Sequence, residues 1–210
     1  MSEATHHNAT RVISDRRPWI LQSALYLLIA TIAVLLSPGR GEGDSWSNTG
    51  ALVQARWASP TARLLDGRVL VVGGRGGPSS YDSLASAEIY DPRSGAWSLT
   101  GAMSAVRYGH TATLLDDGRV LVVGGSDQSA ALLGSAEIYD PASGQWTPTG
   151  RLNQARWNHV AVLLPTGKVL VAGGYEPSAG AYGTSSVEIF DPATGAWSLG
   201  AAMNTGRISP

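Results

Sequence analysis

A tryptophan recurs about every 50 residues along most of this 210-residue chain, and the residues around it recur in step. The four are Trp46, Trp97, Trp146 and Trp197. A fixed period of this length indicates one supersecondary unit copied several times, because a unit that cannot bury its apolar face alone gains stability by stacking on its copies. The chain is therefore predicted to be built from stacked repeats.

Each repeat begins with a predicted β-hairpin. Alignment on the tryptophans superimposes residues 63–74, 113–125 and 162–174, in which a short apolar run turns at Asp-Gly or Thr-Gly and continues as a valine-rich run. Asp-Gly between apolar runs signals a tight turn, because glycine adopts the positive φ that the turn requires. The valine-rich runs are continuously apolar, which predicts strands buried on both faces. They span 69–72, 120–123 and 169–172.

Two further strands complete each repeat. A double glycine ends the second strand, where missing side chains allow a sharp bend or the close approach of another backbone. The pairs are Gly73 and Gly74, Gly124 and Gly125, and Gly173 and Gly174. After a variable loop, the sequence Glu-Ile-Tyr/Phe-Asp-Pro recurs at 88–92, 137–141 and 188–192 and leads through a Gly-containing turn into the tryptophan strand. The pattern predicts four antiparallel strands per repeat and no helix.

The double glycine, the Glu-Ile-Tyr/Phe-Asp-Pro segment and the tryptophan, in this order in three copies, resemble the kelch repeat. The resemblance covers 46–210 and implies an all-β propeller of four-stranded blades around a channel, similar to the bacterial galactose-oxidase-like propellers. The expected repeats are 46–96, 97–145 and 146–196, with 197–210 leading into a further blade. Three complete blades are expected, together with one extra strand at 46–50.

Three blades cannot close a ring by the usual rule, because propellers typically have about four to eight blades. If each open face exposed roughly 500 Å² of apolar surface, leaving it uncovered would forgo about 12 kcal/mol. Two explanations stay open. The favoured one is that the chain is part of a longer reading frame, and the other is that a homodimer closes a six-bladed ring.

An uncharged apolar run at 19–36 is expected to meet a membrane. It follows a polar leader at 1–18 that contains Arg16 and Arg17, and it precedes a linker at 37–45. At 1.5 Å per residue the run spans about 27 Å, enough for the hydrocarbon core. A signal anchor is favoured over a cleaved signal peptide, which would make the protein secreted. Arginines before the span place the repeats outside the cytoplasm.

The overall composition excludes several function classes. A net charge of −1 gives no reason to expect nucleic acid as a partner. The absence of cysteine excludes disulfides, and it also excludes the cysteine-crosslinked copper site of galactose-oxidase-like enzymes. Lys168 is the sole lysine among 15 basic residues, a bias that suggests a GC-rich bacterial genome.

One arginine and one glutamate recur in every repeat. They are Arg56, Arg107 and Arg156, with Arg207 in register, and Glu88, Glu137 and Glu188. The favoured interpretation is that each arginine braces a blade by pairing with a carboxylate or backbone carbonyls, because an unpaired buried charge is costly. The alternative is a ring of arginines that binds an anion. His110 and His159 are interpreted as structural, and no metal or cofactor is expected.

The variable loops are the expected binding surface. The loops between second and third strands and those between blades emerge at one end of the blades, where the copies diverge most. Candidate ligand-binding residues are Trp57, Arg75, Tyr81, Tyr108, Asp127, Trp157, Tyr175, Glu176 and Tyr182. The alternative, which the divergence of these loops favours, is that they only tolerate neutral drift. The expected function is a non-catalytic extracytoplasmic scaffold for a protein or glycan. The alternative is a fragment of a secreted oxidase or glycan-active enzyme whose catalytic residues lie beyond Pro210.

Overall fold

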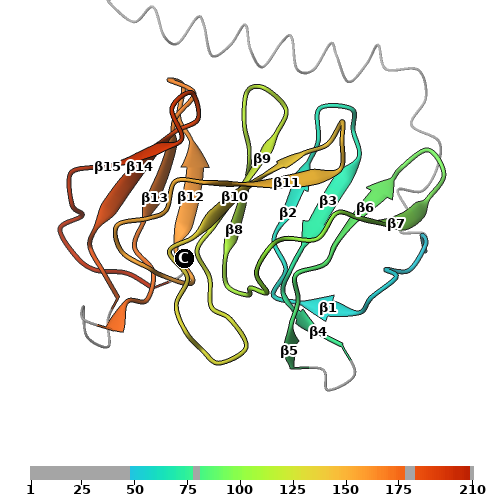
Figure 1. Cartoon of the computed structure of the whole chain (residues 1–210), viewed down its shortest axis with the longest axis horizontal. Helices are drawn as coiled ribbons and strands as arrows, with labels where there is room; N and C mark the ends of the chain where they lie inside the picture. The colour runs from blue at the N-terminus through green and yellow to red at the C-terminus, as the bar shows by residue number, and fades with distance from the viewer. Residues whose placement is uncertain (1–47, 78–80, 178–182, 209–210) are drawn as a thin grey trace, which may run out of the picture. The chain divides into compact units, whose positions relative to one another are not determined.

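The computed structural model describes residues 48–77, 81–177 and 183–208, which belong to one compact unit (Figure 1). In these ranges all regular structure is β-strand, apart from turns and one isolated helical residue. No helix long and apolar enough to span a membrane is found in them. The predicted leader, membrane span and linker at 1–45, and Trp46, lie outside the described residues.

Twelve strands form three four-stranded antiparallel sheets, which we call blades 1, 2 and 3. In each sheet the four strands are ordered as they follow in the chain. Blade 1 comprises β2 (Thr61–Arg63), β3 (Val69–Val72), β6 (Ala87–Asp91) and β7 (Ala96–Thr100). Blade 2 comprises β8 (Thr111–Leu114), β9 (Val120–Val123), β10 (Ala136–Asp140) and β11 (Gln145–Thr149). Blade 3 comprises β12 (Val160–Leu163), β13 (Val169–Ala172), β14 (Val187–Asp191) and β15 (Ala196–Leu199).

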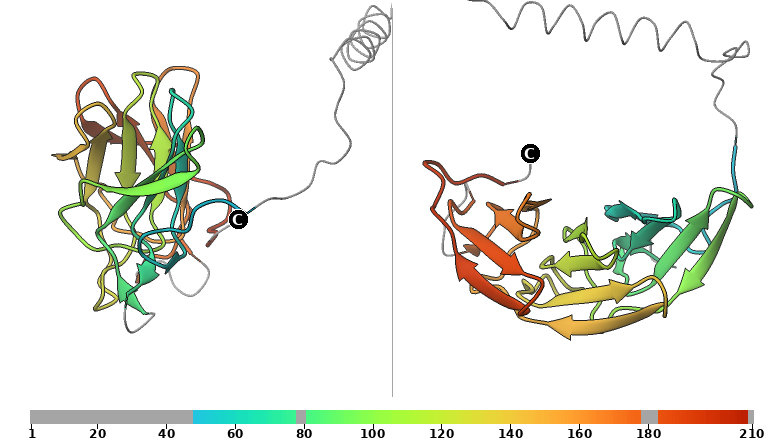
Figure 2. Two further views of the ribbon diagram at one scale, coloured as in Figure 1. Left: turned by 90° about the vertical axis from the view of Figure 1, so that its right-hand side faces the viewer. Right: turned by 90° about the horizontal axis from the view of Figure 1, so that it is seen from above.

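The three blades stand side by side in an arc (Figure 2, right). The first strands β2, β8 and β12 lie on the inner side, and the tryptophan strands β7, β11 and β15 lie on the outer rim. This is the arrangement of part of a propeller, so the predicted all-β architecture with four antiparallel strands per repeat is confirmed.

The turn glycines and the valine-rich strands adopt the conformations that the sequence predicted. Gly67, Gly118 and Gly167 adopt φ values of 90°, 86° and 75° in the turns between first and second strands. The middle strand β9 is buried along its whole length. In β3 and β13, however, Val69 and Leu170 are only half-buried. Each blade at an end of the arc has a neighbour on one side only, which accounts for both exceptions.

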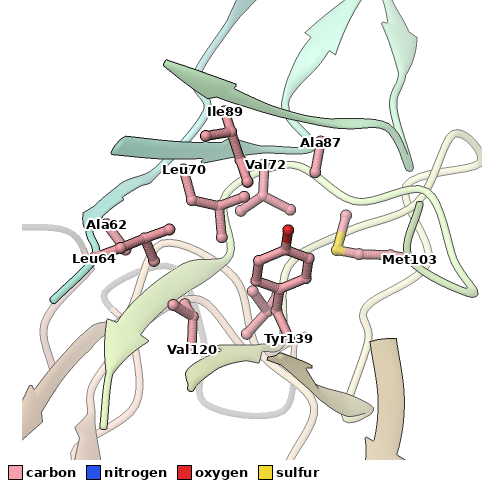
Figure 3. Packing of buried hydrophobic residues seen from close by; sticks show 10 residues of the cluster. Ala62, Leu64, Leu70, Val72, Ala87, Ile89, Met103, Val120 and Tyr139 are labelled. Carbon is pink, nitrogen blue, oxygen red and sulfur yellow. The ribbon is translucent and has the colours of Figure 1, made fainter. Parts of the chain in front are cut away.

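The core consists of two apolar layers, one between blades 1 and 2 and one between blades 2 and 3. Between blades 1 and 2, Leu70, Val72 and Ile89 pack against Val120 and Tyr139 (Figure 3). Between blades 2 and 3 the equivalent layer joins Leu121 and Ile138 to Val171 and Phe190. A blade therefore has two different faces, one turned toward the preceding blade and one toward the following blade.

Two details differ from the sequence prediction. The extra strand expected at 46–50 does not form in the described residues 48–50, which are irregular. A tryptophan strand needs a third strand beside it, and no Glu-Ile-Tyr segment precedes Trp46. Conversely, an unpredicted small sheet joins β1 (Arg56–Trp57), β4 (Arg75–Gly76) and β5 (Asp82–Ser83).

Candidate functional site

The segments before, between and after the three blades hold the structure together, and we call them connectors. Connector 1 is 48–60, connector 2 is 101–110, connector 3 is 150–159 and connector 4 is 200–208. The backbones of connectors 2, 3 and 4 are fixed to the blade before them. In connector 2, the Arg107 N–H donates to the Leu84 carbonyl at 3.0 Å, and the Arg107 carbonyl accepts from Gly74 N–H at 2.9 Å. Connectors 3 and 4 repeat the second bond, with Arg156 accepting from Gly125 and Arg207 from Gly174.

The arginine side chain of the same connector reaches into the following blade. Arg107 Nη1 donates to the carbonyls of Gly124 and Ser135, and its Nη2 lies 2.7 Å from Glu137 Oε1. Arg156 reaches Glu188 at 2.9 Å in the same way, and Arg56 reaches Glu88 at 2.7 Å. Arg107 and Arg156 are thus latches between two successive blades, with the backbone on one and the guanidinium in the other. Arg56 makes the same side-chain contacts in blade 1, and we call all three arginine–glutamate pairs latches.

The three latches are buried ion pairs in which the terminal guanidinium nitrogens and both carboxylate oxygens are hydrogen-bonded, whereas Arg56 Nε and Arg107 Nε are buried without a partner among the described residues. The Arg107 and Glu137 side chains are 0% and 2% exposed. The second oxygen of each glutamate accepts a connector amide, as Glu137 Oε2 does from Ser104 N–H at 2.8 Å. Burial lowers the pKa of Arg107, and the Glu137 carboxylate opposes that shift. Taken alone, this burial would be unfavourable, but the added hydrogen bonds compensate the loss of hydration.

The double glycines lie where two connectors meet. A Cβ on Gly124 would stand 2.7 Å from the carbonyl oxygen of Arg156 in connector 3. A Cβ on Gly125 would stand 2.7 Å from the carbonyl oxygen of Tyr108 in connector 2. Both glycines also have positive φ, 65° and 96°. The pair is therefore required by the close approach of two backbones.

The two histidines lie inside the connectors and are buried, each 5% exposed. His159 Nε2 lies 3.0 Å from Thr111 Oγ1 on the first strand of blade 2. The residue equivalent to Thr111 in blade 1 is Pro60, which offers His110 no hydroxyl. Burial, with the nearby Arg156, lowers the pKa of His159 to about 3. Burial, Arg107 and His159 hold the pKa of His110 well below its usual value. Both rings are neutral at pH 7.

Aromatic side chains from connectors and loops form two groups of contacting rings at one end of the blades, and together with Arg75, which joins them, we call these groups the aromatic row. Tyr108 and Trp157 meet edge to face at 5.5 Å between centroids, and Trp157 meets Tyr175 at 6.2 Å. At the blade 1 end, Trp57 meets Tyr81 at 6.4 Å. Such edge-to-face pairs are favourable because the positive ring edge faces the negative ring face.

Arg75 joins the two halves of this row. Its Cζ lies 3.7 Å from the centroid of Tyr108 and 5.8 Å from that of Trp57. Its Nε is buried without a hydrogen-bond partner, and no carboxylate within the described ranges forms an ion pair with it. Stacking on Tyr108 and Trp57 positions the guanidinium, and a cation placed in this way is able to pair with an anionic group.

The structure thus brings six of the nine predicted loop residues together. The six are Trp57, Arg75, Tyr81, Tyr108, Trp157 and Tyr175. Asp127 organises its own loop, where Oδ1 accepts from Ser129 N–H and Ala131 N–H at 2.8 and 2.9 Å. Glu176 is half-buried and its charge acts on Arg156. Tyr182 lies outside the described residues.

The opposite end of the blades carries the Asp-Gly turns and shallow clefts between adjacent blades. One cleft is lined by Asp66, Arg68 and Arg119, the next by Asp117, Lys168 and Asp191. The charges there are paired locally, as in Arg119 with Asp117 at 2.7 Å and Lys168 with Asp191 at 2.9 Å. In the described part of the chain, no three His, Asp or Glu side chains are grouped so that they could hold a metal ion.

Sequence reasoning missed several partners that complete these sites. The serines before each third-strand glutamate accept from the latch arginines, for example Ser186 Oγ from Arg156 Nη2 at 2.7 Å. Gln128 in blade 2 accepts from Ser83 N–H in blade 1 and so ties two loops together. Serine did recur in register at 86, 135 and 186, which was the available signal. Gln128 has no counterpart in the other two repeats, so the sequence gave no signal for its role.

Comparison with known proteins agrees with this architecture. The kelch motif matches residues 56–104, 107–153 and 156–204. An F-box/kelch-repeat protein of Arabidopsis thaliana is 37% identical over 82 residues, which is 39% of this chain and 21% of that protein. The solved structure of YjhT superimposes with a TM-score of 0.67 at 17% identity, covering 80% of this chain and 59% of YjhT. The chain therefore spans a minor part of the first relative and under two thirds of the second. Because the three kelch motifs cover more than half of the sequence, the chain belongs to the kelch-repeat family.

Proposed function

We propose that this protein is a non-catalytic binding scaffold that holds a protein partner on the aromatic row. The carrying observation is that six residues from connectors and loops along the three blades form one chain of ring contacts, joined by a stacked guanidinium. A rigid repeat frame with unlike loops is how repeat proteins usually carry recognition. Tyrosine, tryptophan and arginine are also the residues that most often dominate binding energy at interfaces.

The exposed fractions of the ring side chains indicate which part of the aromatic row a partner would contact. Trp57 and Tyr81 are 49% and 65% exposed, whereas Tyr108 is 8% exposed. Tyr108 and Trp157 therefore form a fixed base, and Trp57 and Tyr81 with Arg75 form the accessible end. An acidic group on the partner would take the donors of Arg75. Exposed aromatic rings beside polar groups also suit sugars, which makes a glycan the alternative ligand.

We also propose that the repeats act outside the cytoplasm, tethered by residues 19–36. The support is the uncharged run with arginines on its amino side. Protease added to intact spheroplasts should digest the repeats, while a cytoplasmic control protein survives. Full protection of the repeats would contradict this topology.

Site-specific photocrosslinking of the full chain in cells tests the binding surface. A photoreactive phenylalanine analogue replaces Tyr81 on the aromatic row, or Leu65 on the Asp-Gly turn face, which is 71% exposed and serves as the matched control. We expect a discrete adduct from position 81 only, lost on Arg75→Ala. Digestion by protease identifies the partner as protein, and resistance to protease with sensitivity to periodate identifies a glycan. Equal adducts from both positions, or none from either, would reject the aromatic row as the binding site.

A further inference from the structure

A side chain of blade 2 holds the small sheet of blade 1 in place. Gln128 Oε1, in the loop that follows β9, accepts from the Ser83 N–H on β5. Ser83 is 7% exposed, so water has little access to this N–H. A buried donor that lost its acceptor would be left unpaired, which is unfavourable. The bond from Gln128 therefore fixes β5 against blade 2.

Ser83 lies directly opposite Arg75. The two residues are cross-strand partners where β5 pairs with β4, and β4 pairs on its other side with β1, so that Arg75 also lies opposite Trp57. Each of these strands has only two residues, and so small a sheet has few hydrogen bonds of its own to define its position. The position of β5, and with it that of Arg75, is therefore sensitive to the contact that Gln128 makes from outside.

The turn that carries Gln128 is itself attached to the aromatic row. Asp127 closes this turn, because its Oδ1 accepts from two backbone amides of the turn at 2.8 and 2.9 Å. The residue before it, Ser126, exchanges two backbone hydrogen bonds with Tyr108, at 2.9 and 3.0 Å. Gln128 thus projects from a closed turn that is bonded to the tyrosine on which Arg75 stacks.

These contacts form a closed circuit around the stacked guanidinium. Arg75 Cζ lies 3.7 Å from the centroid of Tyr108, Tyr108 is bonded to the turn of Gln128, and Gln128 is bonded through Ser83 back to the strand pair of Arg75. Arg75 Nε is buried and has no hydrogen-bond partner in the described part of the chain. A guanidinium placed by stacking takes its position from its backbone and from the ring beneath it, and the circuit fixes both.

We propose that Gln128 is the positioning residue of the aromatic row, because it fixes Arg75 over Tyr108 and so sets how tightly the row binds an acidic group of its protein partner. This inference rests on the proposed function. A cation that is already held in place binds more tightly, since little freedom remains to be lost on binding. Three residues after the double glycine, where blade 2 has Gln128, the other loops carry Gly77 and Pro177, which have no side-chain acceptor. The circuit is therefore a feature of the junction between blades 1 and 2 and distinguishes the Arg75 end of the row.

The test removes the acceptor of this bond in the full chain. Gln128→Leu lacks the acceptor, Gln128→Glu keeps an acceptor oxygen, and Gln145→Leu at an exposed glutamine of β11 is the matched control. If Gln128→Leu does not fold, Gln128→Asn replaces it, because the shorter side chain withdraws the acceptor. Each protein is purified in mild detergent because of the apolar run at 19–36, and thermal unfolding is measured together with the reaction of Arg75 with phenylglyoxal, followed by peptide mass spectrometry. The adduct yield from the photoreactive residue at position 81 is measured in cells for the same variants.

We expect Arg75 to react at least about tenfold faster in Gln128→Leu, because loss of the hydrogen bond frees the loop and releases the guanidinium from Tyr108. The adduct yield from position 81 should fall by about the same factor, since the cation is no longer held in place. Gln128→Glu and Gln145→Leu should both behave as the unmodified chain does. Arg93, an exposed arginine of blade 1, is the internal reference whose reaction should not change in any variant.

Three results would overturn the proposal, each at a different step. An unchanged reaction of Arg75 in Gln128→Leu, even with a lower unfolding midpoint, would show that Gln128 stabilises the loops without positioning the guanidinium. A faster reaction with an unchanged adduct yield would reject the role of Gln128 in binding. Absence of an adduct from position 81 in every form, the unmodified chain included, would reject the proposed function and the binding role with it, while the reaction of Arg75 would still decide whether Gln128 positions it.

Discussion

At the residue scale, the stability of this fold depends on a small set of buried polar groups rather than on apolar contacts alone. Each latch places an arginine, a glutamate and several backbone groups where water cannot reach them. A buried pair of this kind adds little net stability compared with an apolar replacement, but breaking it by removing one partner is costly. The latches therefore fix how successive blades align, and single substitutions in them should have large effects.

Replacing Arg107 by alanine should lower the free energy of unfolding by about 3–5 kcal/mol, because Glu137 would remain as an uncompensated buried charge. The matched control is Arg119→Ala, which removes a 2.7 Å ion pair with Asp117 whose side chains are 40% and 46% exposed. That control should cost only about 0–1 kcal/mol. Denaturant unfolding of both variants provides the measurement, and equal losses would contradict the latch as described.

Gly124→Ala should also destabilise the chain, by more than about 1–3 kcal/mol. The alanine would adopt a φ of 65° and place its Cβ 2.7 Å from the Arg156 carbonyl oxygen, which is backbone and cannot rotate away. Gly118→Ala in the hairpin of the same blade has a similar φ of 86°, but the nearest atom to its Cβ is the flexible side chain of Leu65 at 3.0 Å. If Gly118→Ala lowers the free energy of unfolding less than Gly124→Ala does, the difference measures the cost of the close backbone approach, because both alanines carry the strain of a positive φ.

The buried histidines predict a specific acid sensitivity. The pKa of His159 is about 3 in the folded chain and about 6.5 when unfolded, so the unfolded chain binds more protons between these values. Stability should therefore fall as pH decreases from about 6.5, by up to about 1.4 kcal/mol per pH unit for each histidine. His110, shifted in the same direction, adds to this slope. Denaturant unfolding between pH 7 and 5 measures it, and a double His110→Gln, His159→Gln variant that keeps the same slope would assign it to other groups.

At the scale of the element, the connectors do more than join blades. Connectors 2 and 3 are each bonded through the backbone to the preceding blade, send an arginine into the following blade, and contribute an aromatic ring to the aromatic row. The latch and the proposed binding surface are thus formed by adjacent residues, such as Arg107 and Tyr108. Changes to the ring should affect binding without opening the interface, whereas changes to the arginine should affect both.

Sequence predicted the strands well because their signals are local. Asp-Gly turns, valine runs and the Glu-Ile-Tyr segment each determine their own conformation, whatever lies next to them. The connectors depend on contacts across blades, and nothing local indicates that Arg107 belongs to one blade by its backbone and to another by its side chain. The small sheet of β1, β4 and β5 was missed for the same reason, since two-residue strands have no periodicity. The convergence of the loop aromatics on one end was predictable from topology, but the stacking of Arg75 between Trp57 and Tyr108 was not.

At the scale of the whole molecule, the three blades are unequally supported although their sequences are nearly the same. Blade 2 has a neighbour on both sides, and its middle strand β9 is buried throughout. Blade 3 has one neighbour and exposes Val160 and Val162. In repeat proteins stability is approximately the sum of repeat and nearest-neighbour terms, so a blade with one interface should open before a blade with two.

Hydrogen exchange on the full chain under native conditions should therefore show a gradient rather than one uniform rate. Amides of β9 and β10 should be the most slowly exchanging, and those of β12 and β13 should exchange faster, because opening blade 3 breaks one apolar layer and one latch whereas opening blade 2 breaks two of each. Arg156→Ala, which removes the latch between blades 2 and 3, should accelerate exchange in β12–β15 and leave β3 and β6 nearly unchanged. Equal protection across the three blades, or equal acceleration in all of them, would mean that the chain opens as a single cooperative unit and that its interfaces are not independent.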